Sequence, residues 1–302
     1  MNHIVPFLGL LVMALGLGGL YRAMNSMLAE EKKRSVSPFT EKLLRPPGES
    51  LRLRIDEIRI KMMDKGLVLA ITLVIPGLMP ILVRTSSIWI SGVVWLTVAI
   101  VSYVIAFRKW RQIKLLRAEL RGYQLGFDGE RYVASELNPL CERGYRVFHD
   151  FVVDWKPGGE TSNFNIDHVV VGPEGVFAIE TKTRRKPLGD NGKQYKMSFD
   201  GKTLHFPGYS TTGSIEQATK NAITLEEWIN GSDKGDIKVR PVLAIPGWYI
   251  DSGPDWRTSG VQRAKGLAEN LPMLGRGRRL SATDVRRIGD RIEAHCRNVE
   301  GA

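Results

Sequence analysis

Long runs of apolar residues fill much of the first third of the chain. Residues 4–21 carry no charged side chain, and neither do residues 67–83, although two prolines and a glycine fall within the second run. Residues 88–107 form a third run that is uncharged throughout. A helix needs about 20 apolar residues to cross the hydrocarbon core of a bilayer. The pattern therefore predicts three membrane-spanning helices, the last two joined as a hairpin by residues 84–87.

From residue 128 onward the pattern changes to the shorter periods of a globular α/β domain. A spacing of three and four residues between apolar positions predicts amphipathic helices at residues 128–140, 214–230 and 283–297. Short apolar or alternating segments predict strands at residues 145–155, 164–172 and 175–182, a hairpin at 195–206 turning at Asp200-Gly201, and a final strand at 239–245.

Three charged residues interrupt the apolar hairpin that residues 164–182 are predicted to form around a tight turn at 172–175. Alternation along a strand places Asp167 on one face of the first strand, and Glu180 and Lys182 on one face of the second. If the strands pair across the turn, these side chains meet at one end of the sheet. Burying two carboxylates and an ammonium is costly unless they pair or hold a metal ion, so the pattern indicates an active site.

The same residues carry a family resemblance. Asp167 followed by Glu180-Thr181-Lys182 resembles the D…(D/E)xK signature of the restriction-endonuclease-like nucleases. The wider context resembles the nuclease-related domain (NERD) family, and it implies a restriction-endonuclease-like α/β core with a central mixed sheet flanked by helices. The elements that carry this second resemblance are Gly126-Phe127-Asp128-Gly129-Glu130, the strand Ile166–Gly172, Gly175-Val176-Phe177, Glu180-Thr181-Lys182 and Gln217.

The resemblance implies a metal-dependent phosphodiester hydrolase. Asp167 and Glu180 would hold Mg²⁺ or Mn²⁺, which neutralises phosphate charge and lowers the pKa of a bound water. Lys182 would position or activate that water and stabilise the developing negative charge. Glu130 would act through the metal or its water, and Gln217 would orient the substrate or Lys182.

Several of these charged and polar residues also have ordinary structural explanations. Glu130 lies near the start of a predicted helix, where an acid favours the helix dipole, and Gln217 completes an S-x-x-Q capping box that begins at Ser214. The basic residues at 184–186, and Arg276, Arg278 and Arg279, are either solvated surface charge, the default, or phosphate contacts. The sequence leaves these alternatives open.

The net charge of +11 is unevenly distributed along the chain. Residues 1–122 carry a net +10 and residues 123–302 a net +1, so the basicity suits orientation in a bilayer better than a global field for DNA. Lys and Arg cluster in residues 22–66 and after residue 107. The positive-inside rule then places the N-terminus outside and residues 108–302 in the cytoplasm. A cleaved signal peptide at residues 1–21 is the rival interpretation, but it lacks a basic start.

The leading hypothesis is a multi-pass protein of the cytoplasmic membrane that hydrolyses nucleic acid, expected to be DNA. The alternative is a non-catalytic, membrane-tethered module that binds nucleic acid or protein. A transporter is disfavoured because the apolar runs contain no Asp, Glu, Lys, Arg or His, and two cysteines cannot build a disulfide framework. The predicted parts are a transmembrane helix at 1–21, a cytoplasmic basic loop at 22–66, a transmembrane hairpin at 67–107, a juxtamembrane helix at 108–122, the nuclease-related domain at 123–250 and a C-terminal helical extension at 251–302.

Overall fold

The chain forms two compact units in the computed structural model. The first comprises residues 1–41 and 56–120, and the second comprises residues 42–55 and 121–302. The structure describes Ser26 and residues 43–82, 87–154, 163–189, 192–231, 236–252, 260–275 and 277–297. The predicted helix at 1–21, the turn at 84–86, the link at 156–161 and Arg276 lie outside these residues.

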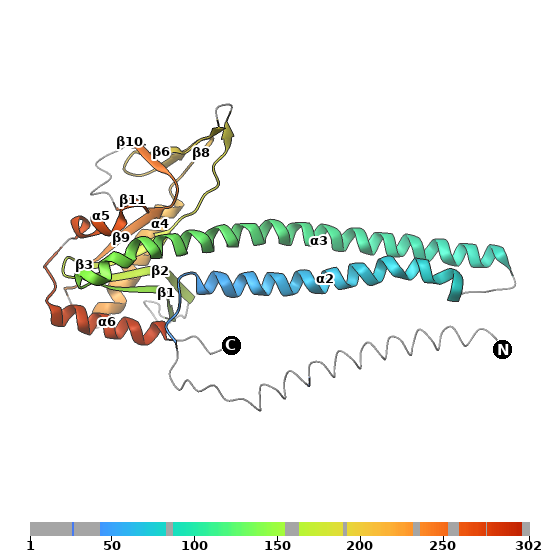
Figure 1. Ribbon diagram of the computed structural model, residues 1–302, viewed down its shortest axis with the longest axis horizontal. Coiled ribbons are helices and arrows are strands. Elements are labelled where there is room, and N and C mark those ends of the chain that lie inside the picture. Colours follow the sequence, from blue (N-terminus) through green and yellow to red (C-terminus); the bar gives the residue numbers. More distant parts are fainter. Residues whose placement is uncertain are drawn as a thin grey trace. The chain divides into compact units, whose positions relative to one another are not determined.

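Helices and strands of the described residues follow one another as Figure 1 shows. The helices are α2 (Glu49–Leu82), α3 (Ile88–Leu137), α4 (Gly213–Asn230), α5 (Leu267–Asn270) and α6 (Ala282–Cys296), with 3₁₀ helices η1 (Asn138–Arg143) and η3 (Leu271–Leu274). The strands are β1 (Arg146–Asp154), β2 (Asn163–Gly172), β3 (Gly175–Thr181), β4 (Leu188–Gly189), β5 (Gly192–Lys193), β6 (Lys196–Phe199), β7 (Leu204–Phe206), β8 (Tyr209–Thr211), β9 (Val239–Ile245), β10 (Tyr249–Ser252) and β11 (Val261–Arg263).

In the first unit, α2 carries the second apolar run and α3 the third, side by side (Figure 1). A proline has no N–H, so it leaves the carbonyl four residues earlier without its helical partner. Pro80 does this to the carbonyl of Pro76, and the indole Nε1 of Trp95 on α3 donates to that oxygen at 3.0 Å. This hydrogen bond helps to explain why α2 continues through prolines that interrupt the sequence pattern.

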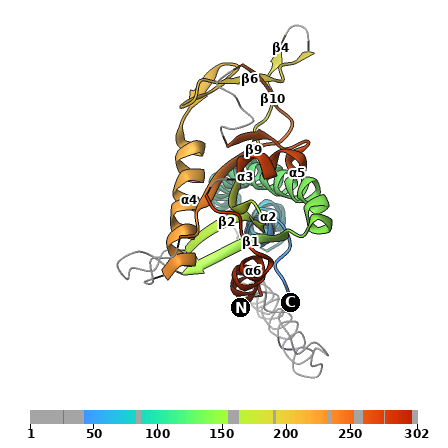
Figure 2. The same ribbon diagram turned by 90° about the vertical axis from the view of Figure 1, so that its left-hand side faces the viewer.

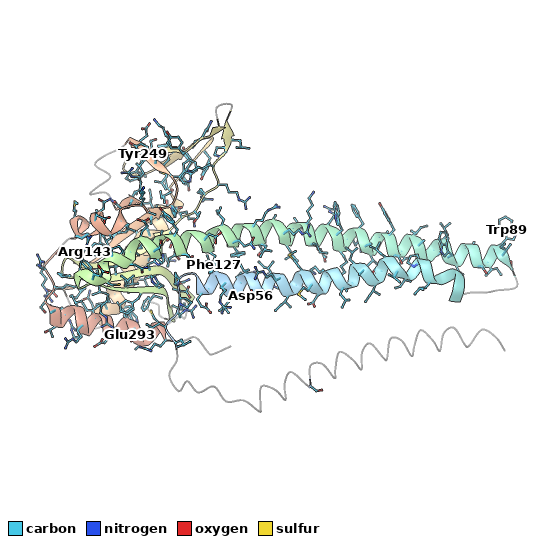
Figure 3. The ribbon with its side chains drawn as sticks, viewed as in Figure 1. Asp56, Trp89, Phe127, Arg143, Tyr249 and Glu293 are labelled. Atoms are coloured by element: carbon cyan, nitrogen blue, oxygen red, sulfur yellow. The ribbon has the colours of Figure 1, made fainter. Side chains whose placement is uncertain are left out.

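The apolar side chains of this unit are largely exposed. Leu73 on α2 is 64% exposed and Trp89 on α3 is 83% exposed, with its ring pointing away from the helix (Figure 3). An exposed apolar surface of this kind is typical of a membrane-facing helix. Within the described residues, α3 is the helix found long and apolar enough to cross a membrane, with a mean hydropathy of 2.2 in its most apolar window.

The predicted hairpin forms the middle of a five-stranded sheet in the second unit, ordered β1-β2-β3-β9-β11. β1, β2 and β3 are antiparallel neighbours, whereas β9 and β11 continue the sheet in parallel. Gly172 pairs with Gly175 across the two-residue turn, which confirms the register read from the alternation. Every residue of β3 is buried, so its charged position lies in the interior.

Helices cover both faces of this sheet and make the domain mixed α/β, as predicted (Figure 2). On one face, α4 and α6 pack around Phe151, Val169 and Ala178. On the other face, Val133 and Leu137 from the last part of α3 join Phe177 in a second core, together with α5 and η3. The central sheet is therefore the middle layer of three.

A smaller sheet, ordered β10-β6-β7-β8, contains the hairpin predicted at 195–206. The prediction that 239–245 is the final strand is wrong, because β10 and β11 follow it. β10 pairs in parallel with β6, and β11 pairs in parallel with β9. Strands of four and three residues are too short to display a period of two, so the pattern could not reveal them.

The helix predicted at 128–140 is not a separate element. It is the last part of α3, which runs without a break from the third apolar run through the predicted juxtamembrane segment 108–122. That stretch contains no proline, so the backbone hydrogen bonds continue. α3 ends at Leu137, where Pro139 follows at the start of η1.

Candidate functional site

Three carboxylates lie on neighbouring strands at one end of the central sheet. In the β1–β2 register, the pairs on either side of Asp150 place it opposite Asp167. The last pair before Asp167 in the β2–β3 register is His168 with Ile179, so Glu180 lies beside Asp167. All three are buried, at 0%, 9% and 3% exposure respectively. The structure therefore brings together the two acids singled out in the sequence, and adds a third.

Each of the two predicted metal ligands is held through one oxygen. The backbone N–H of Thr181 donates to Asp167 Oδ2 at 2.7 Å. Asn221 Nδ2 on α4 donates to Glu180 Oε2 at 3.0 Å. Lys182 follows β3 directly, and its half-buried Nζ lies 4.0 Å from Glu180 Oε1. Thus Glu180 is fixed on one side by an amide while its other oxygen faces the ammonium.

Glu130 reaches the same acids from α3. It is 6% exposed and, in the part of the chain that the structure describes, its Oε2 is buried without a hydrogen-bond partner. Burial raises the pKa of this carboxyl to about 9, with further repulsion from Asp167, Asp150 and Glu180. Glu130 and Val133, three residues apart on α3, are both buried. α3 begins far upstream of Glu130, so Glu130 is not in the first turn of its helix. Its position therefore favours a role beside the acid site over an interaction with the helix dipole.

The other two acids are also hard to ionise. Burial raises the pKa of Asp167 to about 7, against the opposing effects of the Thr181 N–H and Lys182. Burial and the charge of Asp167 raise the pKa of Glu180 to about 8, although Lys182 and Asn221 lower it. A cation close to such carboxyl groups stabilises their ionised form and lowers their pKa.

Gln217 does not reach the acids through any contact described in the structure. It lies exposed on α4, one turn before Asn221, which holds Glu180 instead. The prediction of a capping box at Ser214 is wrong, because α4 begins at Gly213 and Ser214 is a buried residue inside the helix. Asn221 could have been found as a polar residue among inward-facing positions of the helix.

Asp150 was also missed by the sequence reasoning, although the signal was the one that identified Asp167, an acid within an apolar strand. Its backbone has a positive φ of 50°, which is uncommon for a residue other than glycine. Asn165 Nδ2 donates to Asp150 Oδ1 at 2.8 Å, and Arg45 Nε donates to Asp150 Oδ2 at 2.6 Å. A distant segment therefore contributes a cation to this end of the sheet.

The donor chemistry suits a hard divalent cation. Asp167 and Glu180 offer carboxylate oxygens, the ligands that Mg²⁺ prefers, and Glu130 lies near enough for their charges to raise its pKa. Among the described residues no group of three His, Cys, Asp or Glu side chains is spaced to hold a metal ion by itself. Mg²⁺ is commonly held by one or two carboxylates and keeps several waters. A site with Asp167 and Glu180 as its two protein ligands therefore fits this ion.

The basic clusters have mixed surroundings. Arg278 pairs with Asp236 and Asp284, and Arg279 pairs with Glu174, so both are engaged on the protein surface. Arg184 lies over the ring of Tyr209 at 5.8 Å, two residues beyond Lys182. The contacts around 278–279 favour solvated surface charge there.

Fold and site together define a mixed α/β domain with an Asp…Glu-x-Lys cluster on neighbouring strands of its central sheet. Residues 125–246 match the model of the NERD family, the nuclease-related domain, so the chain carries such a domain. This span includes the predicted site residues from Glu130 to Gln217. No curated protein and no solved structure matched the chain. The domain implies a nuclease-related function with nucleic acid as the partner class.

Proposed function

We propose that the protein is a metal-dependent nuclease that hydrolyses phosphodiester bonds of nucleic acid, with DNA as the expected substrate. The observation that carries the proposal is the meeting of buried Asp167, Glu180 and Glu130 with the Lys182 ammonium at one end of the sheet. A stability role explains this cluster poorly, because buried acids with raised pKa values repel one another.

In this mechanism Asp167 and Glu180 would hold Mg²⁺ or Mn²⁺. The ion supplies charge neutralisation at the phosphate and a more acidic bound water. Asn221 orients Glu180, and the Thr181 N–H orients Asp167, so both carboxylates are preorganised. Lys182 donates hydrogen bonds to the attacking water or to the phosphate oxygens as negative charge develops. Glu130 accepts a proton or a water hydrogen bond with its free oxygen.

We further propose that the protein is anchored in the cytoplasmic membrane by more than one helix. The exposed apolar surface of α2 and α3 supports this, together with the basic residues that flank the apolar runs. The nuclease-related domain would then face the cytoplasm, where nucleic acid is present.

A second candidate function is a membrane-tethered module that binds nucleic acid or protein without cleaving it. The spacing of the acids favours it to some extent, since no three ligand side chains of the described residues converge on one point. The near-neutral charge of residues 123–302 is shared by both candidates and does not separate them.

Lys182→Met separates the two functions. If Lys182 acts on the water or on the developing charge, the substitution should lower kcat about 100- to 10,000-fold. Nucleic-acid affinity should fall only by roughly one phosphate contact, which is a change of about one in the salt slope. A cleavage assay on the full-length protein with Mg²⁺ measures kcat, and fluorescence anisotropy measures the salt dependence of nucleic-acid affinity.

The matched control is Lys202→Met, which removes an exposed lysine at the β6–β7 turn. It should cleave like the wild type. A folded Lys182→Met protein that cleaves as fast as the wild type would contradict the proposed mechanism. If the wild type and Lys182→Met bind nucleic acid equally and neither cleaves it, the binding module is favoured.

A further inference from the structure

The connector, residues 43–55, includes the start of α2 and belongs to the compact unit of the nuclease-related domain, although the apolar runs of α2 and α3 separate it from that domain in sequence. The backbone N–H of Arg45 donates to the carbonyl of Cys296 at 2.8 Å, so the connector is attached to the end of α6. Leu51 lies against Gly126 on α3, where an added Cβ would stand 3.1 Å from its side chain. Segments from both ends of the chain thus meet beside the site.

The connector satisfies the buried carboxylate of Asp150. Arg45 Nε and the backbone N–H of Ser50 donate to Oδ2 at 2.6 and 3.1 Å, and the Arg45 Nη2 also pairs with it. Ser50 is in the first turn of α2, where backbone N–H groups have no helical partner, so Asp150 caps this helix from another element. Asn165 holds Oδ1. Both oxygens of Asp150 are therefore occupied by protein donors.

The connector also lies over Glu130. Gly48 has a positive φ of 79°, and a Cβ built on it would stand 2.6 Å from the ring of Phe127 and 3.6 Å from Glu130 Oε2. Phe127 is labelled in Figure 3. A residue larger than glycine at position 48 would be strained by the positive φ and would clash with the ring of Phe127. Gly48 of the connector therefore lies close to Glu130 Oε2, for which the described residues provide no hydrogen-bond partner.

Asp150 stands opposite Asp167, so its state matters to the predicted metal ligands. If Arg45 did not hold it, a free carboxylate would stand next to two acids that already resist ionisation. It would add negative charge to the cation site and compete as a ligand. With Arg45 in place, Asp150 is neutralised by a cation of the protein and leaves the site to Asp167 and Glu180.

We propose that Arg45 is a positioning residue of the acid site: it holds Asp150 away from the metal-binding carboxylates, so that the membrane-proximal connector is a working part of the nuclease-related domain. This inference rests on the proposed metal-dependent function. It implies that the domain is complete only together with residues 43–55, which precede the apolar runs of α2 and α3.

The test is a double-mutant cycle on the full-length protein, read out as the Mg²⁺ concentration that gives half of the maximal thermal shift. Arg45→Met frees a negative charge and should lower this concentration about tenfold, since a carboxylate acts strongly on a nearby divalent ion in a buried site. Asp150→Asn leaves the Arg45 cation unpaired and should raise it. The double variant should return to the wild-type value, and Arg45→Lys, which keeps the charge, should stay near it.

Arg59→Met is the control, because Arg59 pairs with Asp56 on the exposed surface of the same helix, α2. It should leave the Mg²⁺ dependence unchanged. If Arg45→Met and Asp150→Asn lower the melting temperature but keep the wild-type Mg²⁺ dependence, the ion pair is only structural and the inference is wrong. If Arg45→Met does not fold, the sign of the Asp150→Asn shift decides. A wild type without any Mg²⁺ response would instead overturn the proposed function.

Discussion

At the scale of single residues, the site consists of acids that the protein buries without fully compensating them. Asp167 and Glu180 each have one oxygen held by an N–H donor, and Glu130 Oε2 has no partner among the described residues. Asp150 shows the contrast, because protein donors occupy both of its oxygens. The fold therefore separates one structural carboxylate from three that are left for a proton or a cation.

These raised pKa values predict how stability depends on pH. A carboxyl whose folded pKa lies above its unfolded value, about 4, stabilises the folded state in its protonated form, and that contribution is lost as the pH rises through the folded pKa. With unfolded values near 4 and folded values of about 7, 8 and 9 for Asp167, Glu180 and Glu130, the loss begins near pH 4 and is complete only above about pH 9. Mg²⁺ competes with these protons, so its thermal shift should grow over the same range.

The measurement is the melting temperature with and without Mg²⁺ at constant ionic strength, from pH 6.5 upward. Lower pH is avoided because burial lowers the pKa of His149 to about 4, and protonation of this group destabilises the folded state as the pH falls below about 6.5. Asp167→Asn should flatten the Mg²⁺ response. A shift that is independent of pH, or equal in both proteins, would remove the case for a site at Asp167.

At the scale of elements, strong periodic patterns were predicted well. The hairpin β2–β3 and the helix α4 lie within a residue or so of the predicted ranges, because long alternation and amphipathic spacing specify one buried face. Short strands such as β11 carry no such signal. Within α2 the carbonyl of Pro76 accepts its hydrogen bond from Trp95, a residue of another helix, and local sequence cannot reveal that contact.

The apolar helices carry the prediction of topology. Because Lys and Arg cluster in residues 22–66 and after residue 107, the C-terminal domain should lie on the cytoplasmic side. A fluorescent reporter that matures in the cytoplasm should be active when fused after residue 302. A phosphatase that works only outside the membrane should stay inactive at the same position, and the opposite pattern would overturn the orientation.

At the scale of the whole molecule, strand alternation could predict the site only where it is local in sequence, and Glu130 was found only through the family resemblance. Asp167, Glu180 and Lys182 lie within one hairpin, so strand alternation was enough to bring them together. Arg45 and Asp150 are 105 positions apart, and no period in the sequence connects them. Their ion pair depends on the folded domain taking up the connector, and it shows why a boundary drawn at residue 123 omits part of that compact unit.

The most direct test of the central claim is cleavage of labelled single- and double-stranded DNA and RNA by the purified full-length protein, with Mg²⁺ or with EDTA. We expect cleavage of at least one substrate that requires the divalent ion and is lost in Asp167→Asn and Glu180→Gln, with both variants remaining folded. Cleavage that persists in these variants would contradict the assignment of the site. The absence of cleavage with every substrate and metal would contradict the nuclease itself.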